Sequence, residues 1–90
     1  MPRVSAFYGI TIEMYYDDHP PPHFHARYGD ERAKIEIASG KVVVGHLSVP
    51  ALRLVRKWAS EHREELEENW IRLSNEESPK PIEPLTRWKS

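Results

Sequence analysis

The sequence predicts an α+β domain: an antiparallel meander of three to four strands, one long C-terminal helix packed on one face, and an extended proline-rich tail. Apolar and polar residues alternate through the first half of the chain, as in half-buried strands. In the second half, apolar residues recur every three or four positions, as on one face of a helix. Ninety residues suffice for one domain, which we place at residues 1–78, with the tail at 79–90.

Composition excludes several classes of protein. The chain has no cysteine, so disulfides, thiolate catalysis and cysteine-ligated zinc are all absent. No apolar run approaches the roughly 18–20 residues that span a membrane, so we expect a soluble cytoplasmic protein with no membrane partner. The formal net charge of −1 gives no general case for nucleic-acid binding.

We expect strands at residues 8–16, 23–28, 32–37 and 41–44. In the first of them, Tyr8, Ile10, Ile12, Met14 and Tyr16 share the face expected to meet the core. In the second, the expected inward residues are Phe24, Ala26 and Tyr28. Glycine-containing pairs at 29–30 and 39–40 predict tight turns, so the strands are expected to form a meander.

The helix is expected to begin after Ser48, a good N-cap residue, with Pro50 tolerated in the first turn, and to end before Pro79. A helix of about 25 residues is roughly 37 Å long, more than the width of a four-stranded sheet. The charge changes sign abruptly after Ser60: residues 41–60 carry four Lys/Arg and no acid, whereas residues 61–78 carry seven Glu and two Arg. Either the helix breaks near Ser60, or its second half projects and pairs with another copy of the chain.

Three histidines lie within seven residues, beside two aspartates and three consecutive prolines. In a strand, His23 and His25 project from the same face, about 6–7 Å apart at Cα. Asp17, Asp18 and His19, on the adjacent turn, could supply a third ligand. These five residues are our candidate ligands for a divalent metal such as zinc, nickel or manganese.

The same strand face is expected to carry Glu13 and Tyr15, with Arg27 and Lys34 at its edge, on the side of the sheet opposite the helix. A second hypothesis is metal-free acid–base catalysis by Glu13, Tyr15 and the two strand histidines. Arg27 and Lys34 would then contact a phosphodiester or a partner. A third hypothesis is structural, with the histidines packed and hydrogen-bonded against neighbouring strands.

The other two histidines and two of the tryptophans have simpler interpretations. His62 falls on the apolar face of the helix, so we expect it to be half-buried in the core, whereas His46 should face solvent before the helix begins. Trp58 and Trp70 have helical spacing and are expected to pack in the core. In the tail, Ile82, Leu85 and Trp88 are the candidate anchors.

Several runs of residues together resemble a known family. They are Phe7-Tyr8-Gly9-Ile10, Met14-Tyr15-Tyr16-Asp17-Asp18-His19, Pro21-Pro22-His23-Phe24-His25-Ala26, Tyr28-Gly29, Trp58-Ala59, His62-Arg63-Glu64-Glu65-Leu66, Glu68-Asn69-Trp70 and Pro81-Ile82-Glu83-Pro84-Leu85. The chain resembles the small bacterial family called domain of unknown function 4160. The family has no established activity, and its members resemble components of toxin–antitoxin-like gene pairs. The resemblance therefore implies a small protein partner.

Two functions follow as expectations. The first is a bacterial accessory protein that binds a protein partner, as half of a toxin–antitoxin-like pair. The second is a metal-dependent or histidine-based hydrolase of phosphodiesters, similar in class to a ribonuclease, centred on His19, His23 and His25. Nucleic acid is a weaker third partner, because Tyr15 could stack on a base but basic residues around it are few.

Overall fold

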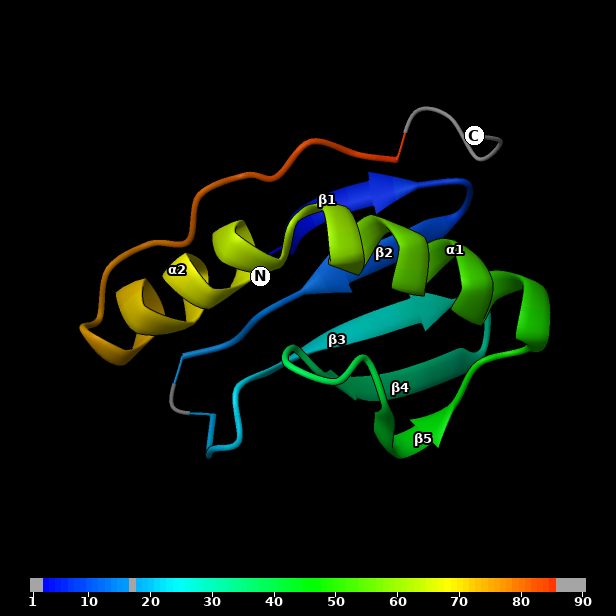
Figure 1. The fold of residues 1–90 in the computed structure, drawn as a ribbon, viewed down its shortest axis with the longest axis horizontal. Helices are drawn as coiled ribbons and strands as arrows, with labels where there is room; N and C mark the ends of the chain where they lie inside the picture. The colour runs from blue at the N-terminus through cyan, green and yellow to red at the C-terminus, as the bar shows by residue number, and fades with distance from the viewer. Residues whose placement is uncertain (1–2, 17, 86–90) are drawn as a thin grey trace.

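The computed structural model describes residues 3–16 and 18–85. They form a five-stranded antiparallel sheet in the order β1-β2-β3-β4-β5, with both helices on one side of it (Figure 1). The elements are β1 (Arg3–Phe7), β2 (Ile10–Glu13), β3 (His23–Tyr28), β4 (Glu31–Glu36), β5 (Val42–His46), α1 (Val49–Glu61) and α2 (Arg63–Ser74). Each strand pairs with the next in sequence, so the predicted α+β class and meander are confirmed, with one strand more than expected.

The additional strand is β1, which lies before the strand predicted at residues 8–16. That predicted strand starts too early, because its first two residues are not part of β2. Tyr8 and Gly9 have positive φ angles of 51° and 81°, and they form the turn of a hairpin that joins β1 to β2. Tyr8 therefore lies outside the ladder and is 52% exposed. Tyr16 and Tyr28, also expected to face the core, are 44% and 42% exposed, because one lies beyond β2 and the other ends β3.

The prediction of a single long helix is also wrong, because the chain leaves the helical conformation at His62, where φ is −124° and ψ is 28°. The break reverses the effect of the charge step seen in the sequence. Glu64 and Glu65 occupy the first turn of α2, where the helix dipole favours negative charge. In one continuous helix they would lie in its C-terminal half, where the dipole disfavours them. Nδ1 of His62 also contacts the Glu65 carboxylate, which stabilises the new helix start.

The hydrophobic core lies between α1 and the sheet and is centred on Trp58, which is fully buried. Its ring centroid is 5.4 Å from that of Phe7 and 5.8 Å from that of Phe24, so α1 contacts both β1 and β3. His62 is half-buried with its ring 5.6 Å from Trp58, as expected. His46 is exposed, also as expected, although it ends β5 instead of lying in a loop.

The tail returns along the helices to β1 (Figure 1). Ile82 and Leu85 are each 4% exposed, which confirms both as anchors, and the Ile82 N–H donates a hydrogen bond to the Val4 carbonyl over 2.8 Å. Trp88, the third expected anchor, lies outside the described residues. None of the described helices is long and apolar enough to span a membrane.

Two buried side chains hold the tail backbone against the helices. Asn69 of α2 is 1% exposed, and its amide Nδ2 donates to the Lys80 carbonyl over 2.9 Å while its Oδ1 accepts the Lys80 N–H over 2.8 Å. Trp58 donates its indole N–H to the Glu83 carbonyl over 2.8 Å. The amide of Asn69 thus replaces the two backbone partners that a neighbouring strand would have supplied.

Candidate metal centre

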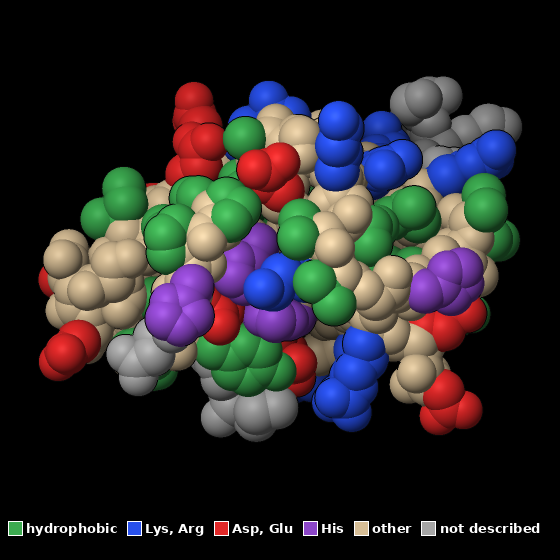
Figure 2. All heavy atoms as spheres, turned by 90° about the horizontal axis from the view of Figure 1, so that it is seen from below, with side chains coloured by type: hydrophobic (Ala, Val, Ile, Leu, Met, Phe, Trp, Pro, Cys, Tyr) green, Lys and Arg blue, Asp and Glu red, His purple; other side chains and the backbone are tan. Residues whose placement is uncertain are grey.

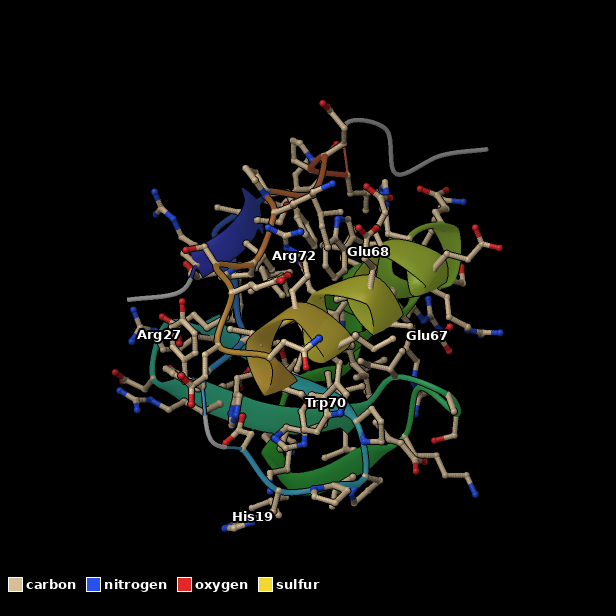
Figure 3. All side chains as sticks on the ribbon, turned by 90° about the vertical axis from the view of Figure 1, so that its left-hand side faces the viewer. His19, Arg27, Glu67, Glu68, Trp70 and Arg72 are labelled. Atoms are coloured by element: carbon tan, nitrogen blue, oxygen red, sulfur yellow. The ribbon has the colours of Figure 1, made fainter. Side chains whose placement is uncertain are left out.

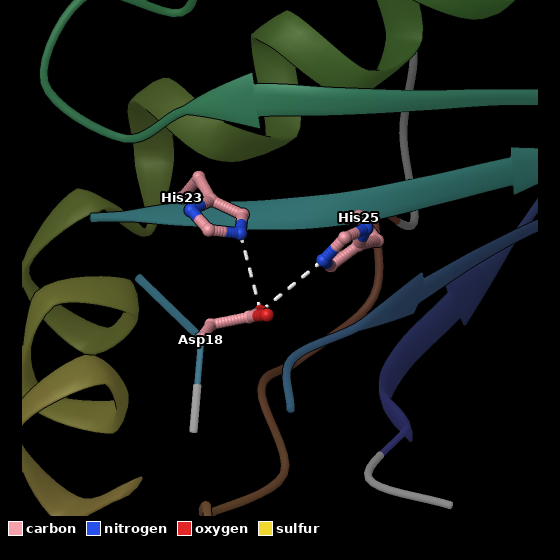
Figure 4. Close-up of side chains that lie close together, drawn as sticks. All are labelled: Asp18, His23 and His25. Atoms are coloured by element: carbon pink, nitrogen blue, oxygen red, sulfur yellow. Dashed lines mark hydrogen bonds and ion pairs between the residues drawn. The ribbon is translucent and has the colours of Figure 1, made fainter. Parts of the chain in front are cut away.

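The candidate site lies where β3 begins. Side chains alternate along a strand, so Phe24 enters the core while His23 and His25 project from the opposite face. His25 lies across from Glu13 on β2 and from Lys34 on β4. The connection from β2 passes this end of the sheet and brings Asp18 back over the two histidines (Figure 4). Its proline run, 20–22, includes a cis peptide bond between Pro20 and Pro21.

One carboxylate oxygen joins the two histidines. Asp18 Oδ2 lies 3.1 Å from His23 Nε2 and 3.2 Å from His25 Nε2 (Figure 4). The ring centroids of His23 and His25 are 5.1 Å apart and their planes are inclined by 74°. One ligand atom from each residue lies within 4.8 Å of the others. Two imidazole nitrogens and a carboxylate oxygen thus converge on a space that one ion can fill.

The hydrogen bonding of His23 fixes which of its nitrogens faces that space with a lone pair. Nδ1 lies 2.9 Å from the Pro21 carbonyl oxygen, which only accepts hydrogen bonds, so Nδ1 carries the proton. In neutral His23, Nε2 is then an acceptor. It is fully buried and has no hydrogen-bond partner among the described residues, because Asp18 Oδ2 is close but poorly directed. A metal-binding histidine typically holds its other nitrogen in this way, bonded to a backbone carbonyl.

The site is closed on one side and open on the other. His23 is 1% exposed, whereas the side chains of Asp18 and His25 are 25% and 30% exposed. The expected position opposite the helix is therefore only half right, because α2 extends past the strand ends (Figure 1). Trp70 of α2 lies against His23, with ring centroids 5.2 Å apart. Trp70 thus has two roles: it is partly buried against the core, as expected, and it also covers His23.

Glu13 and Tyr15 flank His25. The Glu13 side chain is 5% exposed and accepts a hydrogen bond from the Tyr15 hydroxyl over 2.5 Å, while the Tyr15 ring lies edge-on to His25 at 4.8 Å. Burial raises the pKa of Tyr15 above its ordinary value of 10.0, and the hydrogen bond to Glu13 and the negative charge of Glu13 raise it further. Tyr15 is therefore a hydrogen-bond donor at neutral pH and not a phenolate.

A pocket of about 260 Å³ opens beside His25 on the sheet face not covered by the helices. Arg27 and Lys34, which the sequence placed at the edge of the site, line it together with Tyr15. Arg32 also lines it, directly across from Arg27 in the β3–β4 register. Arg32 was not among the predicted site residues, although the turn at residues 29–30 fixes a register that pairs the two arginines. Figure 2 shows histidine, acidic and basic side chains gathered together on this part of the surface.

Two of the predicted ligands lie elsewhere or cannot be placed. His19 is exposed and is not part of the group formed by Asp18, His23 and His25 (Figure 3). Asp17 lies outside the described residues. The structure therefore brings together three of the five residues that the sequence proposed as ligands.

The sequence pattern of the family described as "Domain of unknown function (DUF4160)" matches residues 9–71, more than half of the chain. The chain belongs to this family. The matched range contains Asp18, His23, His25 and Trp70, so the candidate centre of this DUF4160 domain lies inside the part that defines the family. No curated protein and no solved structure gives a significant match.

Proposed function

We propose that this DUF4160 domain is a metal-dependent hydrolase that binds one divalent ion through Asp18, His23 and His25. The observation that carries the proposal is the buried Nε2 of His23, which lies 3.1 Å from the carboxylate oxygen Oδ2 of Asp18 without a hydrogen bond. Two acceptors 3.1 Å apart repel each other unless a proton or a cation lies between them. One ion satisfies Asp18 and both histidines at once.

The donor set favours a transition metal over calcium or magnesium. Two imidazole nitrogens and one carboxylate suit Zn²⁺, and also Ni²⁺, Mn²⁺ or Fe²⁺, whereas calcium and magnesium prefer oxygen ligands. Catalytic zinc sites characteristically have three protein ligands and a free position for water. Two neutral histidines and one carboxylate would leave the bound ion with a net charge of about +1, which favours binding of hydroxide or a substrate anion.

The open side of the site supports a catalytic ion in preference to a purely structural one. Asp18 and His25 are partly exposed, and the pocket beside His25 leads to solvent. A bound divalent ion supplies a water molecule whose pKa is lowered towards about 7, which provides hydroxide at neutral pH. Asp18 and the histidines would hold the ion, while Trp70 excludes water from the His23 side.

Metal titration of metal-free protein, purified without a tag, tests the proposal. We expect one equivalent of Zn²⁺ to bind per chain, and at least a roughly tenfold loss of affinity in Asp18→Asn and in His25→Ala. His46→Ala is the matched control, because His46 is exposed and lies outside the group. Binding that is lost equally in the control, or absent in the unmodified protein, would contradict the proposal.

A second candidate function is a protein partner in a toxin–antitoxin-like pair. It is favoured by the outer edge of β5, the last strand of the sheet, where Val43 and Val44 are 49% and 59% exposed. Unpaired strand edges can accept a strand from another protein. Co-purification with the product of the adjacent gene should be abolished by Val43→Lys, and retention of the complex would argue against this edge. Pairing of two copies of the chain and a cytoplasmic location stay predictions. The pairing was expected through the projecting half of one long helix, and the break at His62 removes that helix.

A further inference from the structure

The pocket beside the candidate metal centre has an excess of unpaired positive charge. Arg27, Arg32 and Lys34 line it, and among the described residues none of the three lies within ion-pair distance of a carboxylate. Glu13 is the acidic residue of the lining and is instead hydrogen-bonded to Tyr15. Three cations against one carboxylate leave the pocket positive before any metal is bound.

The placement of these cations is unfavourable for the sheet alone. Arg27 and Arg32 are cross-strand partners, and like charges directly opposite each other destabilise an antiparallel pair. Lys34 lies beside them on the same face, across from His25. An anion bound between the three side chains would remove the repulsion. Arginine guanidinium groups bind tetrahedral oxyanions with two parallel hydrogen bonds, which suits a phosphoryl group.

We propose that this pocket binds the phosphoryl group of a phosphate ester, the substrate class of the metal centre. The inference rests on the proposed function, because His25 belongs both to the ligand group and to the pocket lining. In the reaction, a water oxygen bonds to phosphorus and the bond from phosphorus to the ester oxygen breaks. The proton lost by the water is matched by the proton that the leaving alcohol gains.

The size of the pocket limits the ester. At about 260 Å³ it lies just below the roughly 300–1,000 Å³ typical of small-molecule sites. It therefore accommodates a phosphoryl group with one small substituent, and anything longer must extend across the open face of the sheet. Val44 and Gly45 of β5 form its far wall and offer an apolar surface for that substituent.

The test uses zinc-loaded protein and inorganic phosphate as the probe, with acetate at equal ionic strength as the anion control. We expect phosphate to bind more tightly than acetate. We expect Arg27→Gln and Arg32→Gln each to weaken phosphate binding about tenfold or more while zinc affinity stays within about twofold. Arg53→Gln is the matched control, because Arg53 is an exposed arginine on α1. Unchanged zinc affinity in the pocket variants also shows that they are folded.

Turnover of phenyl phosphate and of bis(4-nitrophenyl) phosphate distinguishes a monoester substrate from a diester, and turnover of either supports the inference. Equal phosphate affinity in the pocket variants and the unmodified protein would overturn it, as would turnover of neither ester. These failures leave the metal centre standing if zinc still binds with the expected dependence on Asp18. Absence of zinc binding is the separate result that contradicts the proposed function.

Discussion

Replacement of Asn69 tests how the tail is held against α2. Asn69→Ala removes two hydrogen bonds to the Lys80 backbone, of 2.9 and 2.8 Å. At about 1 kcal/mol net for each bond, we expect a loss of about 2 kcal/mol in the free energy of unfolding. The tail should stay docked but open more often, because the buried side chains of Ile82 and Leu85 still contribute about 1.5–3 kcal/mol each.

Asn69→Asp sharpens the test, because it keeps the size of the side chain and replaces the donor of one hydrogen bond by an acceptor. An ionised carboxylate oxygen would then face the Lys80 carbonyl oxygen at the position of the present 2.9 Å bond, inside a site that is 1% exposed. We expect a loss of about 3–4 kcal/mol at neutral pH, more than for alanine. Protonation restores a donor, so the folded state binds the proton more tightly than the unfolded state. The deficit should therefore shrink as the pH falls from about 7 to about 4.

Urea denaturation followed by tryptophan fluorescence measures both losses, and limited proteolysis near residues 77–85 reports opening of the tail. Asn75→Ala is the matched control, because Asn75 is exposed and ends α2 without a side-chain hydrogen bond to the tail. A change within about 0.5 kcal/mol is expected there. An Asn69→Asp variant as stable as the unmodified protein at neutral pH would refute the reasoning.

Three further predictions concern the strands and the site. Gly45→Ala should lower the free energy of unfolding by about 2 kcal/mol or more, measured by urea denaturation, because φ is +89° and the new Cβ would lie 2.2 Å from the Arg32 carbonyl oxygen. Tyr15 has a raised pKa, so its stabilising contribution is complete below pH 10.0 and is lost as the pH rises through its folded-state pKa. Tyr15→Phe should therefore remove a change in tyrosine absorbance that occurs above pH 10.0. If the variant instead removes a change below pH 10.0, the assignment of a raised pKa is contradicted. Zinc affinity should fall at least about tenfold between pH 7.5 and pH 5.5 by calorimetry, because histidine ligands must lose their protons, and a flat profile would exclude them as ligands.

The parts of the fold that could be predicted are those with a strong local pattern. Alternation placed β3 at residues 23–28 as observed, and β4 within one residue. The hairpin before β2 was missed because its first turn residue is Tyr8, and an aromatic residue with positive φ has no characteristic sequence pattern. The sequence left two alternatives for the helix: a break near Ser60, or one long helix with a projecting second half. The charge step after Ser60 shows where a single helix is unfavourable, but it does not show whether the chain breaks there.

In the site, too, the residues close together in sequence could be predicted and those brought in by tertiary contacts could not. Asp18, His23 and His25 lie within eight residues, so strand geometry and one turn were enough to bring them together as candidates. Trp70 and Arg32 were not assigned to the site, because their positions depend on tertiary contacts: the angle at which α2 leaves His62, and the register between β3 and β4. Exposure was the least predictable property, and His23 is buried by a residue 47 positions further along the chain.

The strictly sequential pairing of the strands has a consequence for the order of assembly. All five strands and all three candidate ligands lie before residue 47, and every strand pairs with its neighbour in sequence, so the contacts that shape the site are local ones that form early. During synthesis the ribosome releases this part before α2, and the Ile82 contact with Val4 closes the molecule last. A metal ion would meet the ligands while His23 is still accessible, and Trp70 would enclose it afterwards.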